Sequence, residues 1–153
     1  MKHKYSACLL GLIFILAMTG CTHYKGGDPD LWGLWKLDAL TIDGQPDPNY
    51  DGNVFWAFQS SIIMVQEVDD EMHESLDHYG TWSLDRETST LTLTFNYAND
   101  QTPPGTGMYA PPAVIYITAP VTALNVIELK DKTMTASHVA GGRIITYSLR
   151  RWN

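Results

Sequence analysis

Apolar and polar residues alternate one by one along parts of this chain. The clearest case is residues 91–97, LTLTFNY, where leucine or an aromatic residue occupies every second position and threonine or asparagine lies between. A period of two places the apolar set on one face of a strand, whereas a helix would scatter it around its axis. The pattern therefore predicts a β-strand at 91–97.

Further segments show weaker strand patterns separated by turn signals such as Asp43-Gly44 and Gly141-Gly142. The expected strands are 33–42, 54–59, 61–68, 79–84, 113–118, 125–130, 133–138 and 143–152. Residues 113–130 count as one strand broken near Ala119-Pro120 or as two strands, because proline cannot donate to a ladder. Short strands joined locally predict an all-β fold, an up-and-down antiparallel β-barrel of about eight strands, which has no exposed edges.

Two connections are longer than tight turns. In residues 69–78, Met72, Leu76 and the adjoining Tyr79 keep helical spacing, which predicts one short helix. Residues 98–112, ANDQTPPGTGMYAPP, are too rich in proline and glycine for regular structure. Within this loop, Met108 and Tyr109 either fold over a barrel mouth as a lid or pack beneath their own loop.

The first 20 residues have the layout of a signal peptide. Lys2 and Lys4 precede residues 7–17, which are apolar apart from Gly11. This stretch is shorter than the roughly 20 residues that a membrane-spanning helix needs. The following Thr19-Gly20-Cys21 resembles a bacterial lipobox, which implies cleavage before Cys21 and acylation of that cysteine. The alternative is an ordinary secretory signal followed by an incidental cysteine.

The lipid would make the membrane a partner through Cys21, because several acyl chains together give stable anchoring. We expect a location in the cell envelope, at the outer membrane, with no preference between its periplasmic and surface faces. Residues 21–30 are rich in glycine, proline and charge, which predicts a lipidated flexible tether. Residues 31–153 would form the barrel domain.

Charge and cysteine content limit the possible binding partners and the interactions that can hold the domain together. After Cys21 the chain carries 17 acidic residues against eight Lys or Arg, a formal charge of −9. Nucleic acid is excluded as a partner, because binding it depends on clustered cations. An acidic domain is also repelled by anionic lipid head groups. Since the only other cysteine, Cys8, lies in the leader, the mature domain has no internal disulfide and must be held by packing.

Residues at the two ends of the domain carry a family resemblance. Gly33-Leu34-Trp35 resembles the G-x-W signature of lipocalins, and Arg150 and Arg151 fall where that family ends its last strand. The resemblance implies that Trp35 closes the base of the barrel and that an arginine lies across its ring in a cation–π contact. First and last strands are neighbours in an eight-stranded meander, which agrees with such a contact.

The order of the other segments supports this resemblance. Residues 80–84, 91–97, 127–129 and the terminal 147–152 follow one another as in the small lipocalin-like lipoproteins of Gram-negative bacteria. The similarity extends over residues 31–153. It implies a shape more than an activity.

The interior of such a barrel is either filled by side chains or wide enough for one small ligand. Tyrosines at core-facing positions favour a cavity, since a buried phenol usually needs a partner. A packed core is the alternative. The residues expected to line the interior and bind a ligand are Trp56, Phe58, Met64, Trp82, Phe95, Tyr97, Tyr116 and Tyr147.

No catalytic or metal signature stands out. The acidic run 67–78, with His73 and His78, lacks the ligand spacing and glycine turn of a calcium loop and the converging histidines of a zinc site, which predicts a solvated charged loop. His138 near Glu128 or Asp131 could form an acid–base pair, but a lone histidine at a strand end is more often structural. Ser60-Ser61 lacks the nucleophile-elbow pattern.

These observations lead to two functional expectations. The first is a lipid-anchored, non-catalytic binding or accessory module for a small apolar ligand, with no cofactor and no metal. The second is an interaction module with a filled barrel that docks to another envelope protein. An aromatic cavity would favour the first, whereas a filled barrel with an exposed aromatic patch would favour the second.

Overall fold

The computed structural model describes residues 27–69, 71–72 and 74–152. The expected signal peptide, Cys21 and most of the tether lie outside the described residues. The strands are β1 Gly33–Ile42, β2 Gln45–Pro46, β3 Val54–Gln59, β4 Ile62–Asp69, β5 Glu74–Asp85, β6 Thr90–Thr94, β7 Val121–Leu129, β8 Thr133–Ala140 and β9 Arg143–Arg151. Short 3₁₀ turns occur at η2 Pro29–Leu31, η3 Gly107–Tyr109 and η4 Ala113–Ile115.

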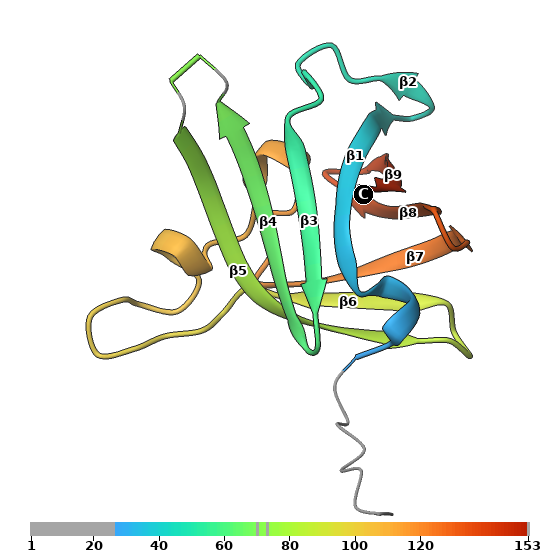
Figure 1. Ribbon diagram of the computed structural model, residues 1–153. Coiled ribbons are helices and arrows are strands. Elements are labelled where there is room, and N and C mark those ends of the chain that lie inside the picture. The colour runs from blue at the N-terminus through green and yellow to red at the C-terminus, as the bar shows by residue number, and fades with distance from the viewer. Residues whose placement is uncertain (1–26, 70, 73, 153) are drawn as a thin grey trace, which may run out of the picture.

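Eight of these strands close into a barrel (Figure 1). Each strand from β3 to β8 pairs antiparallel with the next, and β1 pairs with both β3 and β9. The two-residue strand β2 only extends β1 as a hairpin. The prediction of an all-β, up-and-down antiparallel barrel of about eight strands is confirmed. Of the two counts that the sequence left open, eight is correct.

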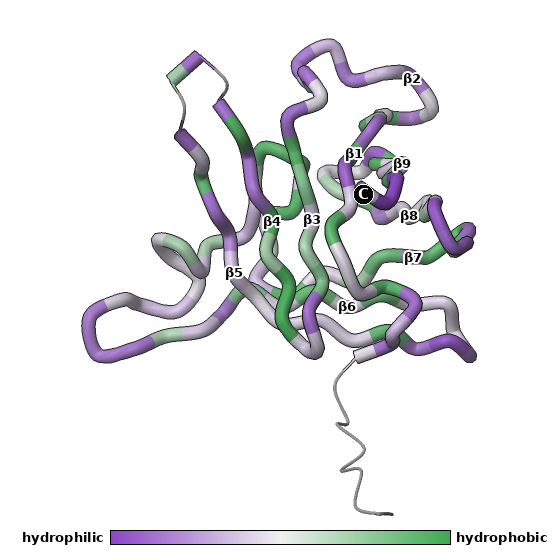
Figure 2. The backbone as a smooth tube through the Cα atoms, viewed as in Figure 1, coloured by the Kyte–Doolittle hydropathy of each residue, from purple (hydrophilic) through white to green (hydrophobic). Residues whose placement is uncertain are grey.

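Side chains from alternate positions of the barrel strands form one core. Figure 2 shows apolar stretches, in green, along β3 and β4. Trp35 on β1 lies opposite Trp56 on β3 and Arg151 on β9. Each large apolar side chain buried in this way contributes about 1.5–3 kcal/mol. The described residues contain no cysteine, so packing stabilises the barrel without a disulfide. Fully buried side chains include Trp35, Leu37, Trp56, Ile63, Val65, Leu91, Leu93, Phe95 and Tyr147.

The short helix expected in residues 69–78 is wrong. This stretch is a hairpin, because β4 runs to Asp69 and β5 begins at Glu74. The Asp69 carboxylate accepts hydrogen bonds from the backbone N–H groups of Glu71 and Met72, both at 3.0 Å, and so sets a local turn. Met72 and Leu76 are 66% and 56% exposed. Because these side chains have no apolar surface to pack on, their helical spacing does not stabilise a helix.

The strand expected at 113–118 is also wrong. Residues 113–115 form η4, and Tyr116 after it has the left-handed φ of 65°. Pro111, Pro112 and Pro120 flank this segment and favour a non-ladder conformation. β7 instead begins at Val121, and β6 ends at Thr94.

Candidate functional site

One end of the barrel is closed around Trp35. The Arg151 guanidinium lies over the Trp35 ring, 4.4 Å from its centroid. The Trp35 indole N–H donates to the Leu31 carbonyl at 2.8 Å, which fixes η2 across the barrel end. Gly33 has a φ of +122°, a conformation that L side chains rarely adopt, and a Cβ there would lie 3.1 Å from the Arg151 guanidinium. The backbone conformation at position 33 therefore favours glycine two residues before Trp35.

The two arginines of the last strand have different roles. Arg151 donates to the carbonyls of Trp32, of Asp30 at 2.6 Å and of Asp131 at 2.8 Å, and so joins η2 to the β7–β8 turn. Arg150 points outward and pairs with Asp38 at 2.7 Å. Of the two residues that the resemblance singled out, Arg151 is the one on Trp35.

Five of the residues expected to line the interior pack against one another there: Trp56, Phe58, Trp82, Phe95 and Tyr147, each at most 5% exposed. Ring centroids are 5.4 Å apart for Trp56 and Tyr147 and 5.2 Å apart for Phe58 and Trp82. These aromatic residues form a core, with their faces and edges used in contacts to each other.

Residues 113–117, here called the inner segment, pass into this core, where Ile115 and Ile117 have no exposed surface. The Tyr147 hydroxyl donates to the Ile115 carbonyl at 2.8 Å, and burial raises the pKa of Tyr147. The Tyr116 hydroxyl donates to the Asp47 carboxylate at 2.9 Å, a bond that raises the pKa of Tyr116. The inner segment thus supplies the buried phenol's partner.

Two residues expected inside the barrel lie elsewhere. Met64 is between Ile63 and Val65, whose side chains point inward, so its own side chain faces out. Tyr97 follows the end of β6, where the chain has left the barrel wall, and is 58% exposed. Their interior placement was therefore wrong. The sequence alternation at 91–97 continues three residues beyond the strand itself.

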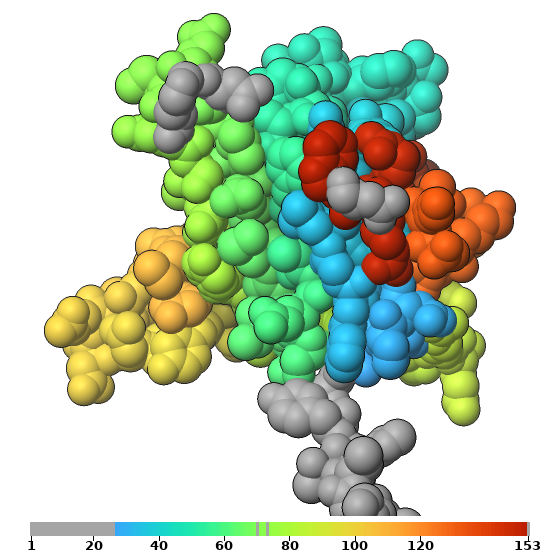
Figure 3. Space-filling model, in the orientation of Figure 1, coloured from blue at the N-terminus to red at the C-terminus, as the bar shows by residue number. Residues whose placement is uncertain are grey.

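An apolar groove lies on the outside of the barrel, between β5 and the loop that carries η3. We call it the outer groove; its volume is about 560 Å³ and it is lined by Ile62, Tyr79, Gly80, Thr81, Thr94, Asn96, Tyr97, Met108 and Tyr109. The rings of Tyr97 and Tyr109 pack at 4.7 Å between centroids. The loop of residues 98–112 extends from the side of the barrel in Figure 3. Met108 and Tyr109 thus lie against the outer wall, where Met108 is 53% exposed.

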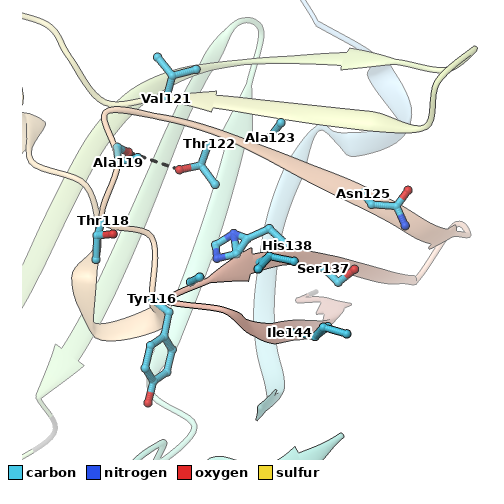
Figure 4. A pocket seen from close by; sticks show the side chains of 13 residues that line it. Tyr116, Thr118, Ala119, Val121, Thr122, Ala123, Asn125, Ser137, His138 and Ile144 are labelled. Carbon is cyan, nitrogen blue, oxygen red and sulfur yellow. Dashed lines mark hydrogen bonds between the residues drawn. The ribbon is translucent and has the colours of Figure 1, made fainter. Parts of the chain in front are cut away.

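A second pocket lies where β7 and β8 separate (Figure 4). Their pairing stops at Asn125 and Ser137, so Val121–Leu124 pair only with β6 and His138–Ala140 only with β9. We call the space between these two edges the lateral opening; its volume is about 580 Å³. Its lining is Tyr116, Thr118, Ala119, Val121, Thr122, Ala123, Asn125, Ser137, His138, Val139, Ala140, Gly141 and Ile144.

His138 is the histidine in the wall of this opening. Both ring nitrogens are shielded from solvent and have no hydrogen-bond partner among the residues that the structure describes. The ring packs edge-on against Tyr147 at 5.7 Å. Burial lowers the pKa of His138, so the neutral imidazole, with one donor and one acceptor nitrogen, is favoured.

Some residues of each pocket were candidates from the sequence, but neither pocket was predicted as a whole. Tyr97 and Tyr116 were candidate ligand contacts and now line the outer groove and the lateral opening respectively. Ile62, Gly80 and the edge residues of β7 and β8 were missed. The available signals were Pro120 and Gly141-Gly142, which bracket the stretch where the two strands separate.

The acidic residues of the β4–β5 hairpin, together with Asp51 and Asn53, line a polar pocket of about 690 Å³. Within residues 27–69, 71–72 and 74–152, no three His, Cys, Asp or Glu side chains are placed to hold a metal ion. None of the helices in this part of the chain has the length and apolar character to span a bilayer.

The closed antiparallel barrel, with Trp35 and Arg151 at its base, defines the lipocalin-like class of β-barrel proteins. Residues 16–139 match the family described as a lipocalin-like domain, and the chain belongs to that family. The fold is consistent with a binding module.

Solved structures show the same fold. A lipocalin-like protein from Bacteroides uniformis ATCC 8492 superposes with a TM-score of 0.55 at 17% identity, over 80% of this chain and 99% of that one. An uncharacterized protein from Bacteroides eggerthii DSM 20697 gives 0.54 at 16% identity, with the same coverage. These likenesses concern the fold. No curated protein matches the chain.

Proposed function

We propose that this protein is a lipid-anchored, non-catalytic binding module of the bacterial cell envelope, and that it holds a small apolar ligand in the outer groove. One observation carries the proposal: large apolar side chains gather exposed in a formed groove, while the expected interior site is packed. Ile62, Tyr97 and Met108 are 52%, 58% and 53% exposed. Exposed apolar groups gathered in this way mark interaction sites, and the volume falls in the usual range for small-ligand sites.

The walls of the groove are held by the barrel. Gly80 brings β5 close to β6, since a Cβ there would lie 2.5 Å from the Thr94 carbonyl oxygen and 2.8 Å from the Phe95 ring. The opposite wall is η3, which contacts β5. A ligand would therefore meet a largely pre-formed apolar surface, and little ordering would be needed on binding.

The tether supports a membrane source for the ligand. Six residues, 21–26, separate the expected lipid on Cys21 from Gly27 and reach at most about 20 Å when extended. Gly27 packs so closely on the Ser60 carbonyl and the Trp82 ring that a side chain there would collide with both. Ile62 in the groove follows Ser60 by two residues. The groove and Gly27, to which the expected tether leads, thus lie at the same end of β4.

Binding of a neutral apolar fluorophore, N-phenyl-1-naphthylamine, to the mature chain carrying Cys21→Ser tests the proposal. We expect saturable enhancement of its fluorescence and at least a tenfold weaker Kd in Ile62→Asp, because a carboxylate in the groove would be desolvated by the probe. The matched control is Ile127→Asp, since Ile127 is 59% exposed on β7 and lines neither pocket. No binding, or equal loss in both variants, would contradict the proposal.

A further inference from the structure

The barrel wall has two unpaired strand edges facing each other across the lateral opening. Two backbone bonds fix which groups of β7 face it. The Val126 N–H donates to Ser89 at 2.7 Å, and the Pro120 carbonyl accepts from Phe95 at 2.7 Å, so both residues point toward β6. Backbone direction alternates along a strand. Val121 and Ala123 therefore direct their N–H and C=O groups into the lateral opening.

The facing edge of β8 follows from the same alternation. Asn125 points away from β6, and its partner across the ladder is Ser137. Val139, two residues after Ser137, has the same backbone orientation and so also faces the lateral opening. Three residues thus present donors and acceptors that no strand of the described chain pairs with. Such an edge is a template for one more strand.

The side chains around these edges restrict the occupant. The lining contains no Asp, Glu, Lys or Arg, so a charged group would enter without a counter-ion. Val121, Val139 and Ile144 are 54%, 70% and 54% exposed. The imidazole of His138 favours its neutral form and so adds no charge to this lining.

We propose that the lateral opening binds a short, uncharged, extended segment of another polypeptide, which pairs as an added strand with Val121 and Ala123 of β7 and contacts Val139 and His138 of β8. Main-chain bonds supply the affinity in this mode, and the apolar side chains select the segment. Four strand residues extend about 13 Å, comparable with the unpaired stretch of β7. This partner is distinct from the apolar ligand of the outer groove.

The probe is the blocked peptide acetyl-Thr-Val-Thr-Val-Thr-amide, titrated into the mature Cys21→Ser protein and followed by amide NMR. We expect saturable shifts at His138 and slower hydrogen exchange at Val121, Ala123 and Val139. A peptide with lysine in place of threonine should bind at least tenfold more weakly. Protection elsewhere, or no binding at all, would overturn the proposal.

Ala123→Pro is the decisive variant, because proline removes an N–H that faces the lateral opening and leaves the bonds to β6 intact. We expect at least a tenfold weaker Kd for the peptide, whereas Ala123→Ser keeps the N–H and should bind normally. Val139→Pro tests the facing edge in the same way, should Ala123→Pro fail to fold. Unchanged affinity in a folded proline variant refutes the added strand. Ile62→Asp, the variant that tests the outer groove, should leave peptide binding unaltered. The proposal for the outer groove and the proposal for the lateral opening can therefore fail independently.

Discussion

At the scale of single residues, His138 has the environment that most affects behaviour with pH. Its two ring nitrogens are shielded from solvent, and no hydrogen bond within the described chain offsets the burial that lowers its pKa. The unfolded chain binds a proton on this residue near the ordinary pKa of 6.5, while the folded chain resists it. Below that pH the unfolded state holds more protons, so stability falls as the pH falls.

We therefore predict that the free energy of unfolding drops between pH 7.5 and pH 5.5, and that His138→Gln drops less over the same interval. Tyr116 and Tyr147, which line the opening or touch the ring, have raised pKa values and do not titrate there. Urea unfolding at the two pH values measures the difference. An equal drop in both proteins would show that His138 does not contribute.

At the scale of elements, the inner segment matters more to the barrel than a connecting loop usually does. Its two isoleucines are fully buried, and its carbonyl at Ile115 satisfies the Tyr147 hydroxyl. A buried phenol without a partner would cost about 1–3 kcal/mol. The segment is therefore part of the core, although it pairs with no strand.

Ile117→Ala should destabilise the protein by about 2–5 kcal/mol, because it removes buried methyl groups and leaves a cavity. Val114→Ala, in the same segment but 44% exposed, should cost less than about 0.5 kcal/mol. Denaturant midpoints of the two variants give the comparison. Similar small effects would mean that the segment is loosely held in solution.

Local patterns predicted most strands because the barrel buries one face of each, and that burial imposes the period of two. The same reasoning failed for 113–118, where VIYI has strand composition but inserts into the barrel as a plug of apolar side chains. It also failed for the lateral opening, since nothing in the alternation of either strand marks Asn125 and Ser137 as the point where β7 and β8 stop pairing. The residues of one strand do not reveal whether the next strand stays paired with it along its whole length.

At the scale of the whole molecule, the proposed lipid on Cys21 would be what holds the barrel at the membrane. Anchoring through Cys21 predicts that Cys21→Ser releases the folded domain from the membrane fraction of the producing cells, because the acidic domain has no other attachment expected. Fractionation with immunodetection is the measurement, and circular dichroism of the released protein checks its fold. A variant that stays in the membrane fraction would contradict lipid anchoring.

The contact of Arg151 with Trp35 also sets the order of events in folding. The two residues that close the barrel stand 116 positions apart in the sequence, 35 and 151, and β1 gains β9 as its neighbour only through residues 145–151. Pairings so distant along the chain form late, because the loop between them must be closed first. During synthesis the barrel cannot close until residues 145–151 have left the ribosome. Removal of residues 145–151 would leave a sheet with two open edges instead of a slightly shorter barrel.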